Sequence, residues 1–332
     1  DASRRDFTIN AFYLDIETRE IFDFFGGLRD LEEKIIRAIG EPRKRFEEDN
    51  LRMLRAVRFA TQLGFCVEKE TFDTIKDLAH NILNISWERI REEFKLIITM
   101  PNRKKGLELL DQSNLLQYIL PEVVAGKGVP QPPDFHPEGD VFTHSLLSVE
   151  KLESFDFSLS FATLLHDIGK IPTFQVADRI RFNNHDNIGA QMAEKVAERF
   201  KLSNKEKEKI VWLIRNHLIF KDIKNMRLSK IKRLFNEAYY SELELLYKAD
   251  KLAANGDLSD YEYTVNLRKT IPPEKPRPII SGDDLIELGL QPSPLFKKIL
   301  NHISDLQLEN KIKTKEQAIE EVRKIIDNNL II

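Results

Sequence analysis

The stretch Arg45-Phe-Glu-Glu-Asp-Asn-Leu-Arg-Met-Leu-Arg-Ala-Val-Arg-Phe59 predicts the helix around which the chain is organised. Its apolar residues recur every three positions, as on one buried stripe of a helix: Leu51, Leu54 and Val57. Three arginines follow the same spacing on a neighbouring face: Arg52, Arg55 and Arg58. Carboxylates gather where the helix dipole is positive: Glu47, Glu48 and Asp49. The pattern suits a ligand with a polar base and a polyphosphate, and a solvated, salt-bridged helix face is the alternative.

Composition indicates a soluble globular protein. The chain has 332 residues, enough for two or three domains, with 42% hydrophobic and 32% charged residues. It contains no run of 18 apolar residues and no signal peptide, so we expect no membrane insertion. The net charge is −3, so nucleic-acid binding must come from local patches. The single cysteine, Cys66, cannot form an internal disulfide, and we expect a core position and a reducing, cytoplasmic location.

Periodicity predicts a mainly helical chain with one strand hairpin. Residues 6–24 alternate and are rich in β-branched and aromatic residues, which is typical of a hairpin. Residues 29–125 and 141–265 predict successive helices, the first of them over Leu31–Ile39. Residues 126–140 form a loop rich in Pro and Gly. Residues 271–278 read as a stiff proline linker before a small helical tail that ends near Ile326.

Four histidines and two aspartates form an ordered set along the chain: His144, His166, Asp167, His185, His217 and Asp250. This order resembles the HD metal-dependent phosphohydrolases. Mixed imidazole and carboxylate ligands suit a divalent transition metal such as Mn, Ni, Co or Fe. We expect four core ligands, with the other two histidines binding phosphate or a second metal: the core set is His144, His166, Asp167 and Asp250. His136, in the preceding loop, is not assigned as a ligand.

Three ordered motifs carry a second resemblance, which covers nearly the whole chain. They are Asp1-Ala-Ser-Arg-Arg-Asp-Phe-Thr-Ile-Asn-Ala-Phe12, then Asp23-Phe-Phe-Gly-Gly-Leu-Arg-Asp-Leu31 followed by Lys34-Ile-Ile-Arg-Ala-Ile39, and Glu48-Asp-Asn-Leu-Arg52. Together they resemble the bacterial class II tRNA nucleotidyltransferase and poly(A) polymerase family. The resemblance implies template-independent addition of CCA, CC or A to the tRNA 3′ end from CTP or ATP, with Mg²⁺ as cofactor.

The resemblance also implies roles for individual residues. Glu48, Asp49 and Arg52 would read the Watson–Crick edge of the incoming base, because carboxylates accept from amino groups and arginine donates to ring nitrogens. Arg5, Arg55 and Arg58 would hold the triphosphate, and Asp6 and Asn10 would orient the ribose and the strand end. Contacts to the tRNA acceptor end are expected from local basic stretches, for which a solvated helix surface is the alternative: Arg103, Lys104, Lys105, Lys224, Arg227, Lys230, Lys232 and Arg233.

One departure from the family pattern concerns catalysis. The family begins with a Gly-Ser turn and an Asp-x-Asp pair that holds the catalytic metals, and no such combination occurs here. Asp15-Ile-Glu17 has the spacing but lies downstream, and we interpret it as the end of a hairpin. We therefore expect that more chain precedes Asp1, that most Mg²⁺ ligands lie there, and that this chain by itself does not add nucleotides.

These observations predict a mainly α architecture with four parts. They are a palm remnant with a β-hairpin (1–40), a helical neck and body for nucleotide selection (41–125), an HD metal-binding domain (126–270), and a linker with a helical tail (271–332). Three functions remain open: the nucleotidyltransferase, an HD phosphohydrolase acting on 2′-phosphates or 2′,3′-cyclic phosphates, and an RNA-binding fragment. The sequence leaves the added nucleotides and the oligomeric state undetermined.

Overall fold

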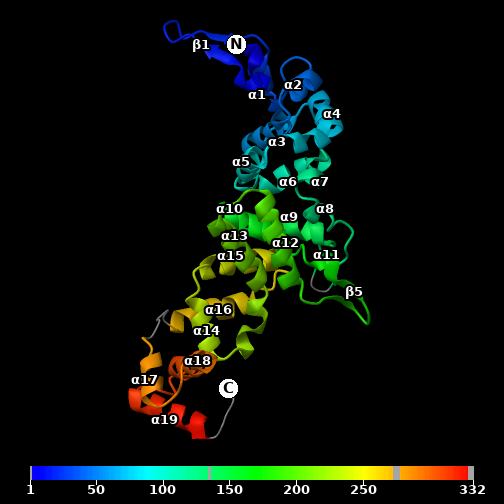
Figure 1. The fold of residues 1–332 in the computed structure, drawn as a ribbon. Helices are drawn as coiled ribbons and strands as arrows, with labels where there is room; N and C mark the ends of the chain where they lie inside the picture. Colours follow the sequence, from blue (N-terminus) through cyan, green and yellow to red (C-terminus); the bar gives the residue numbers. More distant parts are fainter. Residues whose placement is uncertain (1, 134–135, 272–276, 328–332) are drawn as a thin grey trace. The chain divides into compact units, whose positions relative to one another are not determined.

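The computed structural model describes residues 2–133, 136–271 and 277–327 and confirms a mainly helical fold (Figure 1). The chain divides into two compact units. Unit 1 comprises Asp1–Leu218 and Glu242–Leu258, and unit 2 comprises Ile219–Ser241 and Ser259–Ile332. Among the described residues, no helix combines the length and the apolar character that a bilayer-spanning segment needs. The four domain boundaries expected from the sequence remain a prediction.

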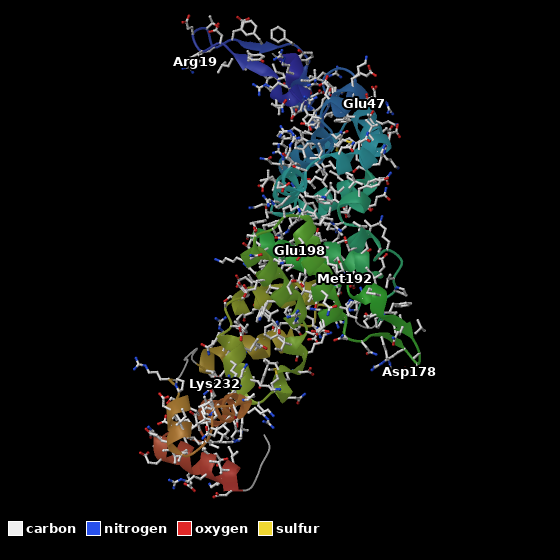
Figure 2. The ribbon with its side chains drawn as sticks, viewed as in Figure 1. Arg19, Glu47, Asp178, Met192, Glu198 and Lys232 are labelled. Atoms are coloured by element: carbon white, nitrogen blue, oxygen red, sulfur yellow. The ribbon has the colours of Figure 1, made fainter. Side chains whose placement is uncertain are left out.

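The expected N-terminal hairpin is present. β1 (Phe12–Leu14) pairs antiparallel with β2 (Ile21–Asp23). Asp15 closes the turn, because its carboxylate accepts hydrogen bonds from the backbone N–H groups of Glu17 and Thr18 at 2.8 and 3.0 Å. The interpretation of the Asp15–Glu17 segment as a hairpin end is therefore confirmed. Figure 2 shows Arg19 at the tip of this hairpin.

The helix expected over Leu31–Ile39 is wrong in its second half. α1 (Gly27–Glu32) ends early, and β3 (Ile35–Ile36) pairs in parallel with β4 (Cys66–Val67). This pairing joins segments about thirty residues apart, so local periodicity does not reveal it. Cys66 lies in this short strand and is exposed, so its expected core position is also wrong.

The remaining N-terminal part of unit 1 is a set of packed helices. α3 buries the expected stripe, because Leu51, Leu54 and Val57 are at most 6% exposed. Gly64, in the left-handed conformation, ends that helix. The elements of this part are η1 (Ala2–Arg4), η2 (Thr8–Asn10), α2 (Pro42–Glu48), α3 (Leu51–Leu63), α4 (Lys69–Leu78), η3 (Ala79–Asn84), α5 (Trp87–Ile98), α6 (Arg103–Gln112), α7 (Leu115–Ile119) and α8 (Pro121–Val124).

The second part of unit 1 packs its helices into a continuous core with the first. The Phe94 ring of α5 lies 5.7 Å from Phe161 and 5.5 Å from Phe200, centroid to centroid. Asp140, Asp156 and Ser203 cap the helices that follow them, so backbone donors at those helix starts are satisfied. The helices are α9 (Val141–Lys151), α10 (Phe157–Leu165), α11 (Lys170–Thr173), α12 (His185–Arg199), α13 (Asn204–Asn216) and α15 (Tyr240–Ala253).

A strand hairpin interrupts these helices, where the sequence predicted helix throughout. β5 (Phe174–Val176) pairs antiparallel with β6 (Ile180–Phe182). The hairpin projects from the surrounding helices, with Asp178 at its tip (Figures 1 and 2). Its alternating apolar residues carried the strand signal, and the helical context on both sides concealed it.

Unit 2 has a small apolar core of its own. Its elements are η4 (Ile219–Asn225), α14 (Leu228–Phe235), α16 (Ser259–Thr270), α17 (Gly282–Glu287), α18 (Pro294–Leu308) and α19 (Lys315–Asp327). Buried aliphatic side chains from the last three helices and their connections form the core: Ile280, Leu285, Ile299, Ile303, Ile312, Ala318, Val322 and Ile325. The helical tail expected from the sequence is therefore present, while most of the proline linker, residues 272–276, lies outside the described residues.

Candidate functional site

The arginine row of α3 is partly exposed beside the buried stripe. The side chains of Arg52, Arg55 and Arg58 are 14%, 30% and 12% exposed. The Phe59 ring lies beneath two of them, with the guanidinium carbons of Arg58 and Arg55 4.0 and 5.5 Å from its centroid. Phe59 in turn meets the edge of Phe7 at 5.7 Å. The row is therefore a fixed surface rather than a freely solvated one.

Carboxylates from other segments of the chain alternate with these arginines. Asp6 accepts from Arg52 Nε at 3.2 Å and from Arg55 Nε at 2.6 Å. Arg52 also donates to Glu48 at 2.7 Å. The result is an alternating array of guanidinium and carboxylate groups. The structure thus brings together Asp6, Glu48, Arg52 and Arg55, four of the residues that the resemblance assigned to the nucleotide, although their roles remain a prediction.

Glu93 of α5 completes this array, and the sequence did not reveal it. Its carboxylate accepts from Arg58 Nε at 2.6 Å and from Arg55 at 3.4 Å, and the residue is 8% exposed. On a helix as charged as Trp87–Ile98, a buried glutamate resembles its solvated neighbours. Only the burial of a charged side chain identifies it as a partner.

Asp49 is held apart from the arginine row. Its carboxylate accepts from Arg89 of α5 at 2.8 Å and from the backbone N–H of Leu51 at 3.1 Å. Arg5 contributes its backbone carbonyl, which accepts from Arg45, and the Asn10 side chain accepts from the Phe7 backbone at 3.3 Å. Hence Glu48 and Arg52 lie together, whereas Asp49 is bound to an arginine of another helix.

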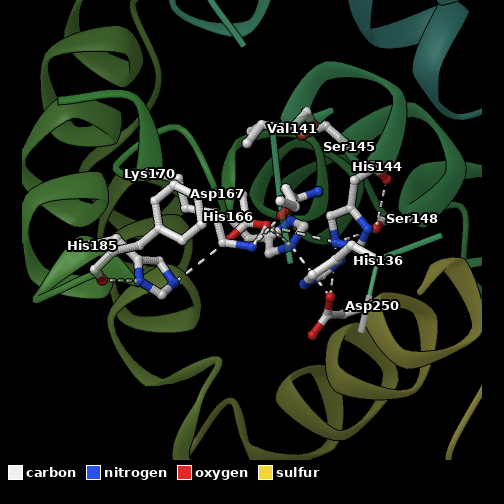
Figure 3. A network of polar contacts seen from close by, with 12 residues as sticks. His136, Val141, His144, Ser145, Ser148, His166, Asp167, Lys170, His185 and Asp250 are labelled. Carbon is white, nitrogen blue, oxygen red and sulfur yellow. Dashed lines mark hydrogen bonds and ion pairs between the residues drawn. The ribbon is translucent and has the colours of Figure 1, made fainter. Parts of the chain in front are cut away.

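The histidines and aspartates of the ordered set converge in one buried cluster, and four of the six lie where helices end or begin (Figure 3). His166 and Asp167 follow α10, His217 follows α13, and His185 opens α12. His144 comes from α9 and Asp250 from α15. Each of these six residues is at most 9% exposed. The structure therefore brings together all six predicted metal ligands from across 107 residues of sequence.

Three of the rings are held in one tautomer by backbone carbonyls three residues earlier. Nδ1 of His166 donates to Thr163 at 2.7 Å, Nδ1 of His185 to Phe182 at 2.7 Å, and Nδ1 of His217 to Ile214 at 2.6 Å. Each ring therefore turns its Nε2 toward the cluster. A ring nitrogen that donates to a backbone carbonyl while the other nitrogen faces a cluster is typical of histidines that bind metals.

Glu138 orients the fourth ring, and the sequence analysis missed it. Its carboxylate lies 2.6 Å from His144 Nδ1 and 2.9 Å from His136 Nδ1. His144 Nε2 faces Asp250 at 2.9 Å. Although burial opposes ionisation, the hydrogen bonds from the two histidines lower the pKa of Glu138 to about 2. The carboxylate therefore remains charged and fixes the His144 tautomer.

Asp167 lies at the centre of the cluster. One oxygen is 3.2 Å from His166 Nε2 and 3.6 Å from His144 Nε2, and the other is 3.6 Å from His185 Nε2 and 3.8 Å from His217 Nε2. Among the described residues, three groups of side chains are close enough to hold an ion: His144, His166 and Asp250; Asp167, His185 and His217; and His136, Glu138 and His144. The two oxygens of Asp167 lie between the first two groups.

The donor set fits a divalent metal. His166 Nε2 is buried and faces the oxygens of Asp167 and Asp250 at 3.2 and 3.6 Å, although neither contact has hydrogen-bond geometry. Burial opposes a charged ring, yet Asp167 and Asp250 raise the pKa of His166 to about 10, so a proton takes the place a cation would occupy. Burial and the positive charge of His166 lower the pKa of His217 to about 3, so that ring is neutral. Clustered carboxylates and inward-facing imidazole nitrogens are the ligands of transition-metal sites.

Lys170 and Gln131 lie beside the cluster and were also missed. Lys170 Nζ is 2.6 Å from Asp167 and donates to Gln131 Oε1 at 2.6 Å. Gly169 lets α12 approach closely, because a Cβ at this position would lie 2.0 Å from the carbonyl oxygen of His185. The sequence Ile-Gly-Lys after the His-Asp pair was the available signal for Lys170, whereas no sequence pattern indicated Gln131.

The basic residues predicted to bind RNA have different environments. Arg103 is 3% exposed, and its guanidinium donates to the carbonyls of Leu152 and Ser154. It holds two segments together, so its expected contact with RNA is wrong. Partly exposed Lys104 and Lys105 contact Glu150 and the Gly64 carbonyl. In unit 2, Arg227 and Lys230 line a pocket of about 510 Å³, and the others bind neighbouring groups: Lys224, Lys232 and Arg233.

Three family models match this chain in order. Residues 1–37 match the poly A polymerase head domain, residues 64–126 the probable RNA and SrmB-binding site of polymerase A, and residues 141–255 the HD domain. The last of these ranges contains all six residues of the metal-ligand set.

Individual proteins agree with these matches. An A-adding tRNA nucleotidyltransferase of Deinococcus radiodurans is 30% identical, and the alignment covers 96% of this chain and 77% of that protein. A CCA-adding enzyme of Ligilactobacillus salivarius is 32% identical over 99% of this chain and 72% of its own length. The crystal structure of the Bacillus stearothermophilus CCA-adding enzyme in complex with CTP has the same fold, with a TM-score of 0.71 at 24% identity, covering 99% of this chain and 75% of that one. This chain therefore belongs to the family of tRNA nucleotidyltransferases that includes the A-adding and CCA-adding enzymes and carries an HD domain.

Proposed function

We propose that this chain supplies base selection and RNA binding for the template-independent addition of CCA, CC or A to the 3′ end of tRNA. The observation that carries this proposal is the row of arginines on α3, with Glu48 and Asp6 bonded to it, while Asp49 directly precedes the helix and accepts from Arg89. Both an A-adding and a CCA-adding relative match at similar identity, so the choice of product stays open.

The chemistry of the row explains a preference for ATP and CTP. At their Watson–Crick edges adenine and cytosine each present an amino donor beside a ring-nitrogen acceptor, which a carboxylate and an arginine complement. Guanine and uracil present a carbonyl oxygen at the amino position, which a carboxylate repels. Glu48 and Asp49 are the carboxylates and Arg52 is the donor in this proposal. Arg55 and Arg58 then bind phosphates, for which Asp6 and Glu93 act as the resting partners.

Equilibrium binding of the four nucleoside triphosphates tests this proposal. We expect this chain to bind ATP and CTP more tightly than GTP and UTP by isothermal titration calorimetry. Asp49→Ala should reduce that preference, whereas Glu47→Ala, at an exposed neighbouring position, should keep it. Equal affinities for all four nucleotides, or loss of preference in both variants, would contradict base reading by Asp49.

RNA contacts are proposed for the basic residues other than Arg103. Their side chains are at least partly exposed, and their intramolecular partners include carboxylates and backbone carbonyls that phosphates can replace. The proposed set is Lys104, Lys105, Lys224, Arg227, Lys230, Lys232 and Arg233. Binding to tRNA should weaken steeply with salt if these residues contact the backbone.

A second activity is favoured by the Asp167 cluster. We propose that the HD domain hydrolyses a 2′-phosphate or a 2′,3′-cyclic phosphate. His144, His166, Asp167 and Asp250 would hold one divalent metal, and Asp167, His185 and His217 a second. A transition metal such as Mn, Ni, Co or Fe bound there supplies a Lewis acid and lowers the pKa of coordinated water toward 7. Glu138 and the backbone carbonyls keep the imidazole nitrogens aimed at the ions, and Lys170 provides a positive charge for phosphate. For nucleotidyl transfer, Mg²⁺ is the proposed cofactor.

Metal analysis and an ester assay test this second activity. We expect the purified chain to retain a transition metal and to hydrolyse 2′,3′-cyclic AMP with Mn²⁺, Ni²⁺ or Co²⁺. A metal-free chain that is inert with all three ions would limit the HD domain to a structural role.

A further inference from the structure

The side chain of Gln131 is the most unusual polar group beside the metal cluster. The residue is 3% exposed and lies in the loop before α9, where Pro130 pairs with Asp140 in a short bridge. Its backbone N–H donates to the Gly139 carbonyl at 3.3 Å. The loop thus places a neutral amide in the interior. This amide contacts Lys170, and Lys170 in turn contacts Asp167.

The chemistry of Lys170 fixes the orientation of this amide. An ammonium group only donates hydrogen bonds, so the atom 2.6 Å from Lys170 Nζ must be the amide oxygen. The amide nitrogen therefore faces the other way. It is buried, and no described residue accepts a hydrogen bond from it. An unsatisfied buried donor costs about 1–3 kcal/mol, so an acceptor placed beside this nitrogen would be stabilised.

We propose that Gln131 Nε2 and Lys170 Nζ form an anion subsite that binds a phosphoryl oxygen of inorganic phosphate or of a phosphomonoester at the metal cluster. The inference rests on the proposed hydrolase function of the HD domain and names the group that this site recognises. The carboxylates of Asp167, Asp250 and Glu138 repel an anion, so the subsite must compensate. Lys170 supplies a positive charge, and the Gln131 amide supplies a hydrogen-bond donor that does not ionise.

Two substitutions separate binding by Gln131 from mere support of Lys170. Gln131→Glu keeps an oxygen toward Lys170 but removes the amide donor, and Gln131→Met removes both groups at similar volume. Gln191→Met, at an exposed position on α12, is the matched control. The probe is inorganic phosphate, titrated calorimetrically into the full chain with and without Ni²⁺, alongside metal analysis and thermal melting of each variant.

We expect both Gln131 variants to bind phosphate at least tenfold more weakly than wild type, with unchanged metal content, while Gln191→Met is unchanged. Full phosphate affinity in Gln131→Glu would show that the residue only holds Lys170. Loss of metal in either variant would show that Gln131 supports metal binding instead of phosphate binding. Either result overturns the subsite, as does a wild-type chain that binds no phosphate. A chain that binds phosphate as expected but hydrolyses no ester refutes the hydrolase proposal and leaves the subsite standing. If the chain binds no metal, the titration without Ni²⁺ decides the subsite alone.

Discussion

Adding one methyl group at Gly169 should remove one of the two proposed metal ions. Gly169 has ordinary helical dihedral angles, with φ −68° and ψ −18°, so alanine meets no backbone restriction there. The obstacle is space alone. A Cβ would lie 2.0 Å from the His185 carbonyl oxygen and 2.5 Å from the Gly189 nitrogen. Both atoms belong to the backbone of α12, so no change of rotamer relieves the contact.

The required displacement follows from these distances. Ordinary van der Waals contact begins at 3.4 Å, so α12 must move by about 1.4 Å, the difference between 3.4 and 2.0 Å. His185 opens this helix, and its Nε2 is 3.6 Å from Asp167. Metal–ligand distances tolerate only about 0.2 Å. The set of Asp167, His185 and His217 should therefore fail, and overpacking should cost about 1–3 kcal/mol of unfolding free energy.

Metal stoichiometry and urea unfolding measure this outcome. Gly169→Ala should bind about one equivalent of Ni²⁺ where the wild-type chain binds about two. Gly189→Ala is the control, because its Cβ would meet the facing Gly169 nitrogen at 3.3 Å, a contact that a small shift relieves. Two bound ions and wild-type stability in Gly169→Ala would refute the argument, and so would equal damage in both variants.

Four further outcomes are expected. Asp167→Ala should abolish metal binding by elemental analysis while leaving ATP affinity intact, and retained metal would remove its bridging role. Metal affinity should rise with pH between about 7 and 10, because an ion must displace the proton that the raised pKa, about 10, keeps on His166. Calorimetric titrations in buffers of different ionisation enthalpy should detect this proton release. A metal affinity that does not change with pH would exclude proton displacement. Arg52→Ala should relax base choice by about 1–3 kcal/mol in competition binding of ATP against GTP, whereas unchanged preference would show that it does not read the base. Glu93→Gln should lower the free energy of unfolding in urea by about 2 kcal/mol, since the guanidiniums of Arg55 and Arg58 lose a partly buried counter-charge. An unchanged urea midpoint would show that solvent already screens these ion pairs.

Features with a local signature were predictable from the sequence. The buried stripe of α3 follows from spacing alone, and the turn at Asp15 follows from its side-chain chemistry. The metal set was also visible, because metal ligands are few residue types in a recognisable order. The structure shows that all six residues share one cluster, although their function there remains a proposal.

Features that depend on contacts between distant segments were not predictable. The parallel pairing of β3 with β4 gave no local signal and displaced an expected helix. Glu93 and Glu138 look like surface glutamates until their burial is known. For Arg103 the error was the opposite. The basic stretch predicted a contact with RNA, whereas the guanidinium is buried and donates to backbone carbonyls of the chain itself. A sequence shows which residues carry charge, but the folded structure is needed to show which of them are buried and which groups they contact.

The path of the chain gives the metal cluster a thermodynamic role beyond chemistry. His217 is followed after one residue by the segment Ile219–Ser241, which belongs to unit 2, and Asp250 follows soon after the chain returns to unit 1. Ions bridged through Asp167 would tie these two residues together and close a loop of about 34 residues. By the chain-entropy relation for cross-links, such a closure removes about 3–4 kcal/mol of conformational freedom from the unfolded chain. Metal binding would then stabilise the fold around the segment Ile219–Ser241, although that segment contributes no ligand of its own.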